Sequence, residues 1–175
     1  MSFKYLIISV FSLMLVATSL PKNIQKKVDK EVKAAYGIET YELIPVIFNK
    51  SITKVLPSKF GKNNLFKISS SQVNIGYAYI SKAQSKTDEF DYLILFDNDF
   101  IIKRSKVLIY REDYGSEIGS KRWLKQLIGK TQNDTLTYGD NIAAISGATI
   151  SVKSMTNAVN GLLKSIKILH QKQLL

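Results

Sequence analysis

A glycine-centred stretch, Ser146-Gly147-Ala148-Thr149, lies just before the longest helix that the sequence predicts. Free backbone N–H groups and the positive end of the dipole at a helix N-terminus attract a phosphate, and a glycine lets the backbone approach it closely. The hydroxyl of Thr149 would then lie beside that phosphate. The same residues could form an ordinary glycine turn with Ser151 as the helix cap, which is the commoner use of such residues. Residue types alone leave both interpretations open.

Other common kinds of reactive side chain are scarce. The chain has no cysteine, which excludes thiolate zinc sites, iron–sulfur clusters, disulfides and a thiol nucleophile. The only histidine, His170, is the sixth residue from the C-terminus, so a Ser-His-Asp triad or an HExxH zinc site is not expected. We therefore predict no metal site and no catalytic residue of the chain's own. Redox chemistry would need an organic cofactor.

The beginning of the chain has the pattern of an export signal. Lys4 is followed by an almost unbroken apolar run from Leu6 to Leu20, with small residues near its end. We predict a signal peptide or N-terminal membrane anchor at residues 1–20 and one domain at residues 21–175. The protein would then be periplasmic or lie on the outer face of the cytoplasmic membrane. Export makes nucleic acid an unexpected partner, although 25 basic and 14 acidic residues give a net charge of +11.

Part of this basic charge lies in one predicted helix after the apolar run. Its apolar residues recur at helical spacing, and lysines lie between them. The lysine-rich face could contact anionic lipid headgroups beside the membrane. Alternatively, the helix packs on the domain and its lysines are solvated. The apolar positions are Ile24, Val28, Val32 and Ala35, and the lysines are Lys22, Lys26, Lys27, Lys30 and Lys33.

The elements that must position the glycine-centred stretch follow from residue patterning. Residues 52–110 are rich in Val, Ile, Phe and Tyr, with turn clusters at 58–64, 81–89 and 97–99, and this predicts hairpin-connected strands. Helical spacing then appears from Ile118 to Ile128, with Gly129 as a stop, and again from Ser151 onward. We predict an α+β fold in which a mainly antiparallel sheet is covered on one face by helices, the long C-terminal helix among them.

The SGAT sequence, followed by Ile150, Ser151 and a helix, resembles the covalent-flavin motif of the FMN-binding domain family. The segment from Lys106 to Lys130 is similar to the strand, glycine-containing loop and helix that precede this motif, so the resemblance covers about half of the chain. The family includes the C subunit of the sodium-pumping NADH:quinone oxidoreductase and the G subunit of the Rnf electron-transport complex. In this family a flavin transferase esterifies the motif's threonine to the FMN phosphate.

Carried onto this chain, the resemblance implies FMN attached through Thr149. Ser146, Gly147, Ala148 and Ile150 would shape the phosphate turn. Aromatic and acidic residues ahead of the motif are candidates for contact with the flavin ring, and each also has a structural explanation in core packing or helix capping. One position departs from the transferase pattern: Ala143 stands where the family has an aspartate, and Asp140 lies three residues earlier. The ring candidates are the aromatic residues Tyr110, Tyr114 and Trp123 and the acidic residues Glu112, Asp113 and Glu117, of which Glu117 is preferred.

The resemblance implies a protein that relays electrons rather than a free-standing enzyme. It would receive electrons from a redox protein or a membrane electron-transport complex, since no GxGxxG dinucleotide motif appears. Maturation would need a flavin transferase, and anionic lipid is a further expected contact. Two alternatives stay open, a cofactor-free accessory or assembly module with the same fold and a small flavin-dependent reductase.

Overall fold

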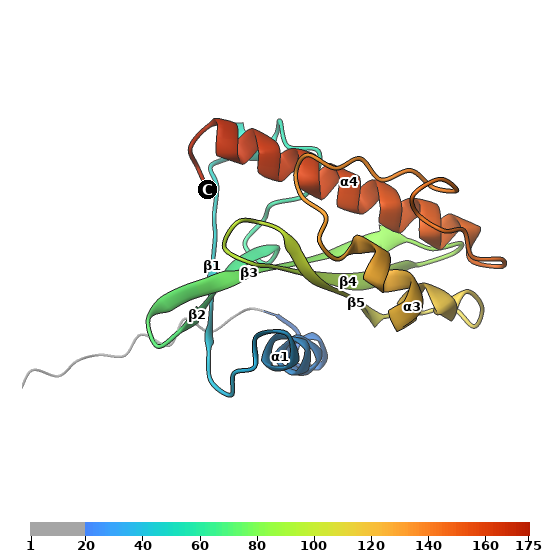
Figure 1. Cartoon of the computed structure of the whole chain (residues 1–175), viewed down its shortest axis with the longest axis horizontal. Coiled ribbons are helices and arrows are strands. Elements are labelled where there is room, and N and C mark those ends of the chain that lie inside the picture. Colours follow the sequence, from blue (N-terminus) through green and yellow to red (C-terminus); the bar gives the residue numbers. More distant parts are fainter. Residues whose placement is uncertain (1–19) are drawn as a thin grey trace, which may run out of the picture.

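The computed structural model describes residues 20–175, so the predicted signal or anchor lies outside the described residues except for Leu20. Five strands form one antiparallel sheet in the order β1-β2-β3-β4-β5 (Figure 1). Consecutive strands are neighbours throughout, which confirms the predicted hairpin-connected α+β fold. The strands are β1 Glu42–Pro45, β2 Leu65–Ser70, β3 Val73–Gln84, β4 Glu89–Phe96 and β5 Ile102–Ile109.

Helices cover both faces of this sheet, so the predicted single covered face is wrong. The long helix α4, Thr149–Gln171, lies over one face, and α1, Lys22–Tyr36, lies against the other (Figure 1). The reason is visible in β4, where Tyr92 and Ile94 point toward α4 while Leu93 and Leu95 belong to the cluster beneath α1. A strand that is apolar on both faces needs cover on both sides.

The strand limits also differ from those expected. β3 continues through Ser81 to Gln84, so the turn predicted at 81–89 begins only at Ser85. Its pairing with β4 extends to Gln84 opposite Glu89, and an ion pair of 3.4 Å joins Lys82 to Glu89. Polar residues can continue this strand because the backbone groups of β3, and not its side chains, make the hydrogen bonds with β4. Ile52, the predicted start of the strands, lies in a short helix, α2, Lys50–Thr53.

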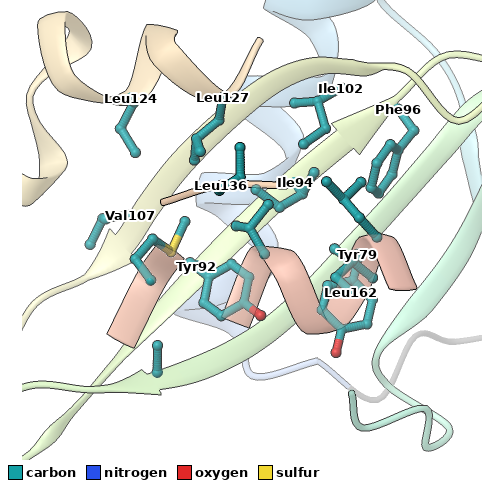
Figure 2. Close-up of a cluster of buried hydrophobic side chains, with 14 of the residues drawn as sticks. Tyr79, Tyr92, Ile94, Phe96, Ile102, Val107, Leu124, Leu127, Leu136 and Leu162 are labelled. Atoms are coloured by element: carbon teal, nitrogen blue, oxygen red, sulfur yellow. The ribbon is translucent and has the colours of Figure 1, made fainter. Parts of the chain in front are cut away.

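The core beneath α4 fixes the position of that helix. Aromatic and aliphatic side chains of the sheet meet Leu162 of α4 and the side chains of Leu124 and Leu127 (Figure 2). The helix predicted at 118–128 is three short pieces, η1 Ser116–Gly119, α3 Lys121–Leu124 and η2 Lys125–Leu127. Ser120 interrupts the helix by accepting a hydrogen bond from Trp123 N–H as the cap of α3. Gly129 has a φ of +81°, in agreement with its predicted role as a stop.

Helix α1 packs on the domain, as the second interpretation of the basic helix predicted, and lipid contact of its exposed lysines stays a prediction. Its apolar residues Ile24, Val28 and Val32 are buried against the sheet. Its Glu31 is also buried and forms an ion pair of 2.5 Å with Arg104 of β5. Lys22, Lys26 and Lys30 remain exposed on the outer side. Within residues 20–175, no helix is both long and apolar enough to span a membrane.

Candidate functional site

Helix α4 begins without a side-chain cap. Its N-cap residue is Ala148, and the first backbone bond of the helix runs from Val152 N–H to the Ala148 carbonyl at 2.9 Å. Ser151 is a first-turn residue rather than the cap, so the interpretation as a turn capped by Ser151 is wrong. With no capping side chain to accept them, the N–H groups of Thr149, Ile150 and Ser151 remain available to a ligand. Gly147 holds the preceding turn at a φ of +80°, where a side chain would be strained.

The uncapped turn opens onto a cleft of about 690 Å³, a volume within the usual range of ligand sites. Three segments form its walls. One is the loop between β3 and β4, one is the chain that leaves β5, and the third is the start of α4 with the glycine turn. Lys86 and Thr87 line the first wall, Tyr110 to Tyr114 line the second, and Gly147 to Ser151 line the third.

Tyr110 joins the second wall to the third. Its hydroxyl lies 3.0 Å from the hydroxyl of Ser151 in the first turn of α4, and either oxygen can donate the hydrogen bond. Gly115 lies directly beside this contact at a φ of +84°. A Cβ atom there would be 2.8 Å from the Tyr110 hydroxyl and 3.3 Å from the Ala148 Cβ. The glycine therefore allows the loop after β5 to lie against the turn that precedes α4.

Glu112 joins the second wall to the first. Its Oε1 accepts hydrogen bonds from Thr87 N–H at 2.6 Å and from Asp88 N–H at 3.2 Å. Hydrogen bonds from Ser85 and from the backbone of Thr87 favour the ionised form and lower the pKa of Glu112 to about 2. The carboxylate therefore holds the β3–β4 loop as an anion throughout the neutral range.

This contact predicts a specific pH dependence. The pKa of Glu112 should lie near 2 in the folded protein, against an ordinary value of 4.5. The ionised Glu112 carboxylate therefore stabilises the folded state fully above pH 4.5. This contribution is lost as the pH falls toward 2, because the carboxyl group takes up its proton at a higher pH in the unfolded chain. An NMR titration of the Glu112 carboxyl carbon measures this value, and Glu112→Gln assigns the signal. A midpoint close to 4.5 would show that the carboxylate does not hold the loop in solution.

Arg111 and Trp123 support the walls rather than presenting free polar groups. The Arg111 guanidinium forms an ion pair with Asp91 and also donates a hydrogen bond to the Glu89 carbonyl at 2.6 Å. The indole N–H of Trp123, which is buried, donates to the Ala143 carbonyl at 2.8 Å. Both side chains fix chain segments that lead into the cleft.

The structure brings together eight of the residues predicted to hold a cofactor. All eight line the cleft: Tyr110, Glu112, Asp113, Tyr114, Gly147, Ala148, Thr149 and Ile150. Thr149 is exposed, and so are two larger side chains of the lining, Tyr114 with 84% and Ile150 with 48% of its surface exposed. These two side chains offer an apolar surface beside the polar turn, as a flat ring with a charged tail requires.

The other three predicted residues do not line the cleft. Ser146 is exposed in the loop just before Gly147, and Glu117 is exposed in η1. Trp123 lies in the core cluster. Their predicted contacts with a flavin stay predictions.

Sequence reasoning missed Lys86, Thr87 and Arg111. The first two lie more than sixty positions before Thr149, in a polar loop whose composition signals only a turn. They reach the site because Gln84 N–H, at the end of β3, donates a 2.8 Å hydrogen bond to Ser154 Oγ in α4. No local pattern in the sequence predicts that tertiary contact.

Residues 86–164 match the FMN-binding domain family. This match confirms the resemblance found in the sequence, and the matched segment contains the lining residues of all three walls of the cleft. A crystal structure of Shewanella oneidensis NqrC has a similar fold, with a TM-score of 0.56 and 16% sequence identity. The similarity covers 82% of this chain and 93% of that one. No curated protein matches the chain.

Proposed function

We propose that this chain is an exported, membrane-associated FMN-binding protein that relays electrons between redox partners. The observation that carries the proposal is the uncapped first turn of α4, which opens onto a cleft of ligand size within the matched FMN-binding segment. FMN, when bound, supplies the redox chemistry, and the protein binds and orients it. The similarity to the fold of NqrC supports a place beside a membrane electron-transport complex.

The residues around the turn suit a phosphate and an attached ring. The free N–H groups of the first turn of α4 and the helix dipole would hold the phosphate, and Gly147 leaves the approach open. We propose that a flavin transferase esterifies Thr149 with the FMN group of a flavin phosphoanhydride donor. The threonine oxygen forms the new bond to the FMN phosphorus while the bond from that phosphorus to the departing nucleotide phosphate breaks, and the threonine proton is lost. Tyr114 and Ile150 would then contact the ring and exclude water from one side of it.

Export and membrane association rest on the beginning of the chain. The apolar run that ends at Leu20 leads directly into α1, whose exposed lysines lie on the side of the helix turned away from the sheet. We propose that Lys22, Lys26 and Lys30 face anionic lipid headgroups and that this attraction weakens as salt is added. An acidic redox protein would be attracted by the same surface charge.

A cofactor-free accessory module is the second candidate, and Ala143 is the observation that favours it. This residue stands in place of the aspartate of the transferase pattern. Its N–H donates to Gln126 Oε1 and its carbonyl accepts from Trp123, both at 2.8 Å. These backbone contacts hold the segment in place without any side chain at position 143, so the fold itself does not need the aspartate.

The test is the intact mass and visible absorbance of the protein exported in its native host. We expect a mass increased by FMN minus one water, the absorbance of an oxidised flavin and recovery with the membrane fraction. Flavin absorbance without added mass would overturn the ester while leaving a flavoprotein. An unmodified mass without flavin absorbance would favour the accessory module, and recovery in the soluble exported fraction would overturn membrane association.

A further inference from the structure

The loop between β3 and β4, Ser85 to Asp88, is held from two sides. On one side, Gln84 N–H donates to Ser154 Oγ, and Ser154 lies one helical turn after Ile150. On the other side, Glu112 accepts from the N–H groups of Thr87 and Asp88. The loop also closes on itself, because the Ser85 N–H donates to the Asp88 carbonyl at 2.7 Å. The loop is therefore fixed beside the start of α4 (Figure 1), and its Lys86 lines the cleft.

The charges that line the cleft are not equally available. Arg111 is occupied by Asp91 and by the Glu89 carbonyl, and Glu112 is occupied by the loop N–H groups. Lys86 is exposed and lines the cleft. No ion pair within residues 20–175 involves it. Asp113, also exposed, is the second acidic lining residue beside Glu112.

We propose that Lys86 is a phosphate-selecting residue of this cleft, and that Glu112 is the positioning residue that keeps it there. This inference rests on the proposed function. The Lys86 ammonium would add a full positive charge to the partial charge of the α4 N-terminus, so a flavin with a phosphate gains over the same flavin without one. The uncharged flavin ring and ribityl chain gain nothing from this lysine.

The experiment compares FMN with riboflavin, which has the same ring and side chain but no phosphate. Both dissociation constants are measured by fluorescence titration on purified chains that carry Thr149→Ala, so that covalent attachment cannot intervene. In this background, Lys86→Gln should weaken FMN binding by roughly threefold to tenfold, the range for one charge contact at an open site, and leave riboflavin binding unchanged. The FMN preference is the riboflavin dissociation constant divided by the FMN dissociation constant. Added salt should reduce this preference more in the background chain than in Lys86→Gln.

Two further variants separate this role from a general loss of charge. Lys153→Gln removes a lysine of α4 that lies over the Tyr138 ring, 5.1 Å from its centroid, and should keep the FMN preference. Lys86→Arg should also keep it. Glu112→Gln should lower the preference toward that of Lys86→Gln and speed hydrogen exchange at the N–H groups of Thr87 and Asp88, because a neutral amide accepts these bonds less strongly.

Each outcome bears on a different claim. A background chain that binds neither flavin would overturn the proposed function and this inference with it. Binding of FMN with an equal preference in Lys86→Gln would overturn only the role of Lys86. Faster exchange in Glu112→Gln with an unchanged preference would overturn the positioning role of Glu112.

Discussion

Thr149→Ala is expected to abolish covalent flavin attachment while the fold is retained. The hydroxyl is the atom that would form the phosphoester, and alanine has no oxygen to replace it. The side chain is exposed at the first position of α4, and the cap residue before it is already an alanine. Alanine is also the best helix former, so the free energy of unfolding should change by less than about 0.5 kcal/mol.

The measurement is intact mass spectrometry of the exported variant, with thermal unfolding as the test of the fold. Thr149→Ser is the matched control, because it keeps a hydroxyl at this position and should keep the added mass in at least part of the protein. Ala143→Asp, examined in the same way, should raise the flavinylated fraction if attachment is incomplete in the unsubstituted chain. Its side chain is exposed, so a carboxylate there meets no packing obstacle.

Flavin mass that persists in Thr149→Ala would place the ester on another hydroxyl, and Ser146 would be the next residue to replace. Loss of the folded state in Thr149→Ala would give Thr149 a structural role that its exposure does not suggest. Noncovalent FMN binding by a stable Thr149→Ala chain, in contrast, is expected, because the first turn of α4 and the cleft are unchanged.

The parts of the site that the sequence could predict are those built from neighbouring residues. The apolar stripe from Val152 to Leu169 has the helical period, so the long helix and the loop just before it were predictable. The helix begins at Thr149 rather than Ser151, a two-residue difference at an uncapped end. This small shift decides the local chemistry, since it places Ser151 inside the first turn and leaves the N–H groups without a cap.

The parts that the sequence could not predict depend on contacts between distant segments. Glu112 resembles an acidic residue near a helix start, but its carboxylate turns to Thr87 and Asp88 on another loop. Trp123 resembles a surface for a ring and is buried beneath the chain before the motif. In both cases tertiary packing determines which of several ordinary uses the side chain has.

Gly76→Ala is expected to cause a large loss of stability. Gly76 lies in β3 at a φ of +153°, which few residues other than glycine adopt. A Cβ atom there would be 2.2 Å from the Phe96 carbonyl oxygen and 2.5 Å from the Tyr36 hydroxyl. That hydroxyl donates a 2.5 Å hydrogen bond to the same carbonyl and so joins α1 to β4.

The alanine must therefore displace either the backbone of β4 or the end of α1. Backbone strain, overpacking and a lost hydrogen bond each cost about 1–3 kcal/mol, so their combination should lower the free energy of unfolding by roughly 3–5 kcal/mol. This is a large part of the 5–15 kcal/mol that is typical of a domain. Urea unfolding followed by circular dichroism measures the loss.

Gly37→Ala provides the matched control, because it separates strain from contact. Gly37 ends α1 at a φ of +67°, and a Cβ atom there would meet nothing within 4 Å. Only the conformational cost of about 1 kcal/mol is expected. Equal losses in the two variants would show that the Tyr36–Phe96 contact does not limit position 76.

The same variant separates the stability of the fold from the function of the cleft. Gly76 lies eight residues before Gln84 along β3, which places it roughly 26 Å from the end of the strand that bears the Lys86 loop. The folded fraction of Gly76→Ala should therefore bind FMN as tightly as the unsubstituted domain, even though less of it is folded. A weaker intrinsic affinity would mean that the packing of α1 against the sheet extends its influence to the opposite end of β3, and the cleft could then no longer be treated as a local structure.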